Sequence, residues 1–502
     1  MLTRARLLMV LLALTAVAGV TAASSAHPDA VTSAASARPS FVVIMTDDQT
    51  YEDMAAMPLT KRLIGDAGAT FTRSYVSYPL CCPSRATYLT GQYSHNNGVQ
   101  SNTPPNGGFE ALDGEHTLPV WLRAAGYDTS HIGKYLNGYG LRRAAVVPPG
   151  WNDWHGAIDK STYQMYGYKL VENGVAQTYG SFDIEDPALY QTDVLRDKAL
   201  GFIDSHADDS DPFLLSLAFV APHGEVSEPG STTQPYVRPA PRHLGRFSGL
   251  RAPRALAGER DVSDKPPYVQ RLKKASTGTA ARIRDDFRSR RESLLAVDEA
   301  VAAVVAALER TGRLGSTYIL FTSDNGFFQG EHRIAKGKYL AYDPSTHVPL
   351  LLRGPGIPAG AVSRELVVNA DLTPTALEAA GAIADRPLDG RSLLPYARDP
   401  NLRSGRPILH EGLVDSDGDG DGAGRGNAVG RYYAIRTDRF LYVSWRGGAR
   451  ELYDLARDPG QMRSVHADRR YRRVRNTLSR ELQRLRRCGG ASCLAPLAPV
   501  TR

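Results

Sequence analysis

The sequence has no long apolar segment beyond its N-terminal region, and this lack argues against a stable membrane span. A membrane-crossing helix needs about 20 consecutive apolar residues. The apolar run from Leu7 to Val20 is shorter, follows Arg4 and Arg6, and precedes small residues suited to cleavage. This pattern is typical of a signal peptide. We therefore expect residues 1–26 to be a signal peptide, residues 27–39 to be a flexible leader, and the protein to be secreted.

Cysteine is scarce, with only four in 502 residues. In an exported protein the usual expectation is disulfide bonding. Cys488 and Cys493 flank a short loop containing two glycines, which can turn tightly enough to join the sulfur atoms. We expect these two to form a disulfide. Cys81 and Cys82 are adjacent, and adjacent cysteines rarely bond to each other, so this pair needs another explanation.

The sequence also lacks an extreme composition or charge. Apolar residues make up 42% and charged residues 23%, which excludes a mostly disordered or fibrous protein. The net charge is +7, and arginines are dense at 469–473. Such a stretch could attract a polyanion. Leu478, Leu482 and Leu485 recur at helical spacing, which favours the solvated face of a surface helix instead. We expect no nucleic-acid partner.

Several apolar runs end abruptly in polar or charged residues. Continuous apolar stretches of this length are typical of strands buried on both faces of a parallel sheet. A strong helix pattern from about 283 to 310 leads directly into one of them. This alternation predicts a doubly wound α/β fold with helices on both faces. The four clearest strands are predicted at Phe41–Met45, Gly126–Ile132, Pro212–Val220 and Tyr318–Phe321.

The polar residues after these strands should meet, because the carboxyl ends of parallel strands share one edge. They are Asp47, Asp48, Lys134, His223, Asp324 and Asn325. The three carboxylates and one amide oxygen suit Ca²⁺, or Mg²⁺, better than zinc. An aspartate at a strand end can instead cap a helix or a turn. Two such pairs on different strands favour a metal site.

The pattern of predicted elements changes after about residue 395. We expect a catalytic domain over 40–395 and a small α+β subdomain over 396–502 with antiparallel strands and a terminal helix. The Asp/Gly segment 415–422 lacks the glutamate that an EF-hand loop requires, so we interpret it as a flexible acidic loop. The Pro- and Arg-rich stretch 227–274 is long for a connection. It either shapes a pocket entrance or is a tolerated insertion.

The segment around the adjacent cysteines is the most informative. Alone, Cys81 could be a thiolate nucleophile activated by Arg85 and a helix N-terminus, or a structural cysteine. However, Cys81-x-Pro83-Ser84-Arg85-x-x-x-Leu89-Thr90-Gly91 resembles the signature of the type I sulfatases, in the alkaline-phosphatase-like superfamily. Other segments on both sides of this signature also resemble those of the family and occur in the same order. They are Phe41–Gln49, Gly133-Lys134, Pro222-His223, Ser323–Gly326, Gly337-Lys338, Val348-Pro349, Arg353–Gly356, Asp371–Thr375, Asp389–Ser392 and Leu452–Leu455.

The resemblance implies a chemistry for the site. A separate formylglycine-generating enzyme would oxidise Cys81 to formylglycine, whose hydrate uses one hydroxyl to attack sulfur and the other to expel sulfate. Cys82 would be a bystander. The implied fold is a large mixed, mostly parallel sheet. The implied reaction is hydrolysis of an aryl sulfate or sugar O-sulfate, so we expect a sulfated small molecule or glycan as substrate.

The resemblance also implies roles for individual residues. Asp47, Asp48, Asp324, Asn325 and the modified Cys81 would bind the cation; Arg85 would hold the aldehyde hydrate and sulfate; Lys134, His223 and Lys338 would bind sulfate or protonate the leaving alcohol. Many members read Gly-Lys-x-His, whereas this chain has Asn137 at the end of Gly-Lys-Tyr-Leu-Asn. Asn137, His95 and His332 are candidate substrate-binding residues. The Gly-Lys-Tyr-Leu-Asn form, with the Cys-Cys pair and the C-terminal clip, resembles the glucosamine-6-sulfatase branch.

Two alternatives remain open from the sequence. A phosphoric or phosphonic monoester hydrolase could use the same fold, because tetrahedral anions differ little in shape. A polyanion-binding surface protein could keep Cys81 as a thiol and use its basic tail.

Overall fold

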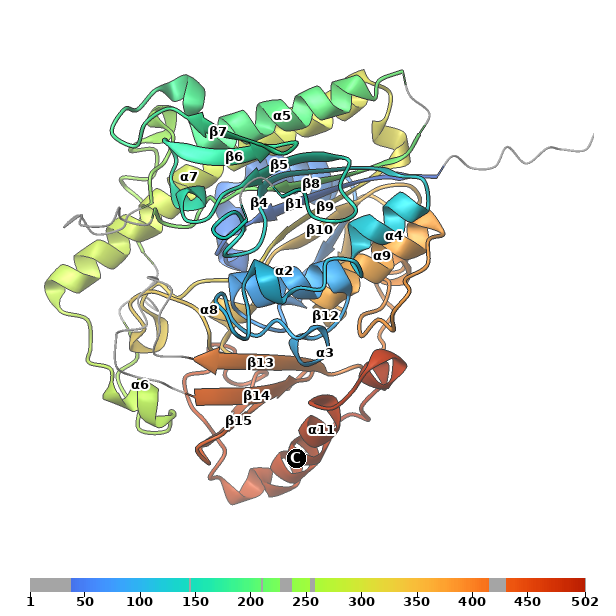
Figure 1. The fold of residues 1–502 in the computed structure, drawn as a ribbon. Coiled ribbons are helices and arrows are strands. Elements are labelled where there is room, and N and C mark those ends of the chain that lie inside the picture. Colours follow the sequence, from blue (N-terminus) through green and yellow to red (C-terminus); the bar gives the residue numbers. More distant parts are fainter. Residues whose placement is uncertain are drawn as a thin grey trace, which may run out of the picture. The chain divides into compact units, whose positions relative to one another are not determined.

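Ten strands form one large sheet at the centre of the protein (Figure 1). Its central strands β9, β1, β8, β4 and β5 are parallel, and antiparallel pairs flank them on both sides. This confirms the predicted mixed sheet. The strand order is β11 (Ala361–Ser363), β2 (Ala69–Phe71), β10 (Leu350–Arg353), β9 (Thr317–Ser323), β1 (Ser40–Thr46), β8 (Phe213–Ala218), β4 (Asp128–Lys134), β5 (Asp153–Ala157), β6 (Tyr168–Glu172) and β7 (Val175–Tyr179).

The computed structural model describes residues 38–143, 146–208, 211–225, 237–252, 258–414 and 430–501. The described residues belong to one compact unit. The predicted signal peptide and nearly all of the predicted leader lie outside the described residues. So do the acidic loop 415–422 and parts of the stretch 227–274.

Helices cover both faces of the sheet, because alternate residues of its strands point to opposite sides. Val42 and Ile44 pack with α5 and α7, whereas Phe41 and Val43 pack with α2, α4 and α9. Figure 1 shows these two helical layers on either side of the sheet. The helices are α1 (Pro58–Thr60), α2 (Cys81–Thr90), α3 (Ser94–Asn97), α4 (Leu118–Ala124), α5 (Gln191–Ser205), α6 (Pro267–Arg271), α7 (Thr277–Arg310), α8 (Asp343–Thr346), α9 (Leu372–Ala380), α10 (Leu394–Arg398) and α11 (Arg472–Leu485).

A second, antiparallel sheet of four strands lies near the C-terminus, as expected. Its strands are β13 (Ile408–Val414), β14 (Gly430–Arg436), β15 (Phe440–Trp445) and β16 (Arg450–Asp454). The predicted terminal helix is α11, and Leu478, Leu482 and Leu485 are among its buried residues. They pack with residues of β13–β16 and with Tyr75 of β3 (Ser74–Tyr75), which pairs with β12 (Val367–Val368).

Candidate active site

Four neighbouring parallel strands deliver polar groups to one edge of the sheet. Asp47 and Asp48 follow β1, and Asp324 and Asn325 follow β9 at the same level, because Thr46 pairs with Ser323. On the other side of β1, His223 follows β8, and Lys134 is the last residue of β4. The backbone N–H of Asp48 donates to Asp324 Oδ1 at 3.2 Å. The predicted convergence of these side chains is therefore observed.

Cys81 is the first residue of α2, and its side chain points into this cluster. Its Sγ atom lies 3.5 Å from Asp47 Oδ1 and accepts a hydrogen bond of 3.0 Å from Lys338 Nζ. Ligand atoms of Asp47, Asp48, Cys81 and Asp324 all lie within 4.8 Å of one another. Each of the four residues is fully buried. A segment far away in the sequence thus completes the group at the strand ends.

Three cationic side chains face the carboxylates. Lys134 Nζ donates to Asp47, and Lys338 Nζ donates to Asp48 Oδ1 at 2.6 Å. Arg85 Nε donates to Asp324 Oδ2 at 2.8 Å. Since these three cations balance three carboxylates, a bound divalent cation would leave the site with a net positive charge. Such a site attracts an anionic ester.

The surroundings of Cys81 raise the pKa of its thiol. Burial raises the pKa of Cys81, the charge of Asp47 raises it further, and Lys134 and Lys338 oppose these effects without reversing them. Burial lowers the pKa of Lys134, but the charge of Asp47 outweighs it, so the pKa lies above its ordinary value. A cysteine acting as a thiolate needs a lowered pKa. The geometry therefore disfavours the encoded thiol as the nucleophile.

The donor set fits a hard divalent cation. Asp47, Asp48 and Asp324 offer carboxylate oxygens, the ligands that Ca²⁺ and Mg²⁺ prefer. The Oδ1 atom of Asn325 is buried and accepts no hydrogen bond from the described residues. Buried polar atoms are normally paired, so this oxygen suits a fourth ligand.

Tyr163 is a site residue that the sequence did not indicate. Its ring lies 4.6 Å from Lys134 Nζ and 4.6 Å from the centre of the His223 ring. Its hydroxyl accepts a hydrogen bond of 2.7 Å from Asn137 Nδ2. Asn137 thus joins the cluster through Tyr163. No motif marks Tyr163, because it lies in a connection between strands and reaches the site only through the fold.

Arg290 was also missed. It lies on α7, is 1% exposed, and donates to the carbonyls of Asp48 and Pro222 at 2.5 and 3.1 Å. It thereby holds the backbone beside both Asp48 and His223. The sequence did contain one indication of this role, because an arginine interrupts the apolar face of the long predicted helix.

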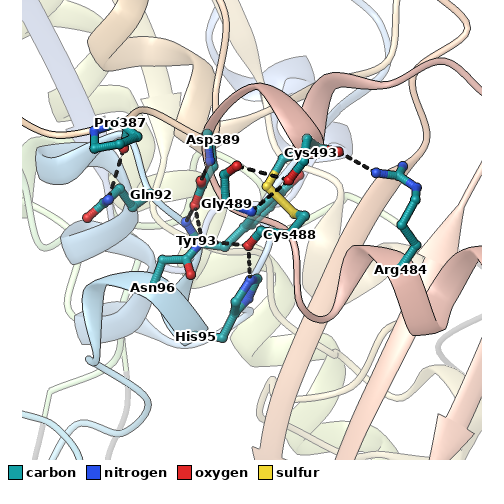
Figure 2. The surroundings of a disulfide bond; sticks show 12 residues. Gln92, Tyr93, His95, Asn96, Pro387, Asp389, Arg484, Cys488, Gly489 and Cys493 are labelled. Carbon is teal, nitrogen blue, oxygen red and sulfur yellow. Dashed lines mark hydrogen bonds between the residues drawn. A yellow bond between two sulfur atoms is a disulfide. The ribbon is translucent and has the colours of Figure 1, made fainter.

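The other two candidate histidines lie outside the cluster. His95, on α3, contacts Glu411 Oε1 at 3.0 Å through Nδ1. Its Nε2 contacts the carbonyl of Cys488 at 2.9 Å (Figure 2). His332 pairs with Glu259 at 2.8 Å and stacks on Tyr342. These contacts are those of structural residues, and substrate binding by either histidine stays a prediction. The predicted disulfide between Cys488 and Cys493 is present.

Comparisons with known proteins agree with this site. The family profile described as Sulfatase matches residues 39–382, and that described as N-sulphoglucosamine sulphohydrolase, C-terminal, matches residues 330–488. An arylsulfatase from Volvox carteri is 33% identical over 92% of this chain and 77% of its own length. The N-acetylglucosamine-6-sulfatase from Homo sapiens is 38% identical over 72% of this chain, and the match spans 64% of that relative's length.

Solved structures share the fold. A protein solved with its substrate D-glucosamine-2-N,6-O-disulfate has a TM-score of 0.73 and 25% identity, covering 89% of this chain and 97% of that one. The family profile covers most of this chain, and the strand-end carboxylates surround Cys81 as the family signature predicts. The chain therefore belongs to the sulfatase family and is a sulfuric ester hydrolase.

Proposed function

We propose that this protein is an exported sulfatase that removes sulfate from a sulfated sugar, releasing an alcohol and inorganic sulfate. The observation that carries the proposal is the buried group of Asp47, Asp48, Asp324 and Cys81 with its cationic neighbours. The sugar is supported by relatives named N-acetylglucosamine-6-sulfatase and by the structure solved with a sulfated glucosamine.

The proposed cofactors are Ca²⁺ and formylglycine at position 81. Asp47, Asp48, Asp324 and Asn325 would hold the cation, which would polarise a sulfate oxygen and offset developing negative charge. Formylglycine, whose mechanism is typical of this family, would supply the attacking hydroxyl. Its formation requires the formylglycine-generating enzyme as a maturation partner.

The chain's own side chains then bind and protonate the ester. Arg85, Lys134 and Lys338 are buried donors at the edge where the sulfate would lie, and they would hold its oxygens. The ring Nδ1 of His223 lies 2.6 Å from the carbonyl of Gly224, and Nε2 faces Asp48 at 3.6 Å. An imidazole fixed in this way can deliver a proton from Nε2 to the leaving alcohol.

Export is proposed from the N-terminal sequence pattern. Two animal relatives are named extracellular sulfatases. Among the residues that the structure describes, no helix is long and apolar enough to cross a membrane.

Mass spectrometry of the peptide containing residue 81 tests the mechanism. Protein from the native host should carry the aldehyde, and an unmodified thiol there would overturn it. A thiol would instead favour the polyanion-binding alternative.

Competing turnover of sulfate and phosphate monoesters by the mature protein tests the reaction. We expect a strong preference for sulfate esters. A preference for phosphate or phosphonate esters would replace this function with the alternative hydrolase on the same fold.

A further inference from the structure

A cavity of about 370 Å³ lies between the first half of α7 and the loop that leads to Lys338. This volume is in the range of small-molecule sites. Polar residues line both walls: Thr279, Arg282, Asp285, Asp286 and Ser289 from α7, and Gln329 and Lys336 from the loop. None of them was assigned a role above.

Both walls of this cavity continue into the catalytic cluster. Arg290, one helical turn after Asp286, donates to the carbonyls of Asp48 and Pro222. On the loop, Lys336 precedes the site residue Lys338 by two positions, and Gln329 follows the proposed ligand Asn325 by four. The same helix and loop therefore carry both the cavity lining and residues of the catalytic cluster.

The lining offers both hydrogen-bond acceptors and donors. Gln329 is 5% exposed, and its Oε1 atom is buried and accepts no hydrogen bond from the described residues. The Asp286 carboxyl is a second acceptor; burial raises its pKa, and the charges of Arg290 and Lys336 oppose that rise. Arg282 and Lys336 are donors. A ligand that satisfies such a lining must itself donate and accept, as hydroxyl groups do.

Apolar side chains share the same cavity. Val237, Ile283 and Ala335 lie among the polar lining and can cover the C–H surface of a ring. An aryl group offers no hydrogen bond to Gln329 Oε1 and would remove the half-buried Asp286 carboxyl from water, which costs binding free energy. Arg282 and Lys336 are matched in number by Asp285 and Asp286, so the cavity has no excess of positive charge that would select a simple anion. A sugar ring satisfies both kinds of surface.

We propose that this cavity binds the alcohol part of the substrate as a sugar ring, with Asp286 and Gln329 as specificity-determining residues that accept hydrogen bonds from its hydroxyl groups. The proposal rests on the proposed function and adds the residues that would select a sugar over an aryl alcohol.

The test compares two ester types on the mature enzyme. In Asp286→Leu and Gln329→Leu, the ratio of kcat/KM for monosaccharide 6-sulfates to kcat/KM for 4-nitrophenyl sulfate should fall at least about tenfold, because each variant removes an acceptor that only the sugar uses. Most of the change should be a higher KM for the sugar. Glu309→Gln, exposed at the far end of α7, is the matched control and should leave the ratio unchanged.

A ratio unchanged in both variants, or equal losses on both esters, would overturn the sugar cavity. So would a wild-type enzyme that hydrolyses the aryl ester but no monosaccharide sulfate. Binding of N-acetylglucosamine 6-sulfate to Cys81→Ala protein, with and without Asp286→Leu, separates the two proposals. If binding depends on Asp286 while the mature enzyme hydrolyses no sulfate ester, the cavity stands and the proposed function fails.

Discussion

The side chain of Cys81 contacts groups that do not favour a reactive thiolate. Its sulfur lies against Asp47 and Lys338, and burial beside a carboxylate raises the pKa of the thiol. The neighbouring Cys82 is equally buried but belongs to an apolar cluster that includes Ala86, Tyr88 and Leu89. The two cysteines therefore differ in surroundings although they are adjacent in sequence.

Replacing Cys81 with alanine should lower the rate of sulfate release at least about a thousandfold, because no other side chain supplies the proposed nucleophile. The fold should persist, since only one sulfur atom is removed. Sulfate release and the melting temperature are the two measurements. Cys82→Ala is the matched control and should retain most of the turnover. Appreciable activity in Cys81→Ala would contradict the assignment.

His410 gives a pH-dependent test of stability. Burial lowers its pKa from 6.5 to about 3, and its Nδ1 contacts the carbonyl of Val76 at 2.9 Å. Because the folded-state pKa is depressed, the unfolded chain binds an extra proton below about pH 6.5, and stability falls as the pH drops. The free energy of unfolding of the wild type, relative to His410→Gln, should fall by about 1 kcal/mol between pH 7 and pH 5.5. Urea titrations measure it, and parallel pH curves would refute it.

At this scale the sequence identified the residues that carry a motif and missed those that only the fold recruits. Asp47, Asp324 and Cys81 come from separate segments, and each bears a local signal. Tyr163 and Arg290 reach the cluster through side-chain direction and helix position, which no short pattern encodes. His95 lies just after the signature, yet its ring contacts the C-terminal clip, because contacts between distant segments decide where it points.

At the scale of elements, the apolar runs predicted the strands well, because burial on both faces leaves a continuous signal. Strands β1, β4, β8 and β9 start and end within about two residues of the predicted bounds. The fifth central strand, β5, was not predicted. Helix α7 begins earlier than the apolar pattern indicates. Ser276 caps it by accepting from the N–H of Thr279 at 3.1 Å, so the helix starts with exposed residues that the pattern could not reveal. The edge strands, short and partly exposed, carried too weak a pattern to predict.

The loop closed by Cys488 and Cys493 fastens the end of the chain to α3. The carbonyl of Cys488 accepts hydrogen bonds from His95 and Asn96, and Asp389 accepts one from the N–H of Gly490 at 2.7 Å (Figure 2). The disulfide thus fixes a backbone segment that forms hydrogen bonds with α3 and with Asp389.

Cys493→Ser should therefore lower the free energy of unfolding by about 2 kcal/mol, the chain-entropy value for a loop of about six residues. Chemical unfolding with and without a reducing agent measures this. The reducing agent should destabilise the wild type and leave Cys493→Ser unaffected. Equal stability of oxidised and reduced wild type would contradict the proposed role.

At the scale of the whole molecule, the C-terminal sheet shares its core with the first part of the chain. Tyr75, Tyr93 and Val368 pack with Ile435 and Leu478. The backbone of β13 is also joined to the first part of the chain, because the N–H of its fourth residue donates to the carbonyl of Ser77 at 2.8 Å. The sequence indicated a change of texture near residue 396, but it could not show that the two regions bury apolar surface against each other. We propose that they unfold together.

A chain shortened to residues 38–395 should consequently fail to fold cooperatively, because it exposes the apolar side chains that the C-terminal sheet and α11 cover. Burial of such a side chain stabilises a fold by roughly 1.5–3 kcal/mol, so losing several exceeds the usual stability of a protein. Soluble yield, thermal melting and dye binding to exposed apolar surface measure the result. A chain ending at Val500 is the control, because it keeps Leu497 and Val500, which pack against the C-terminal core, and it should melt like the wild type. Cooperative melting of the 38–395 chain would show that the region folds alone.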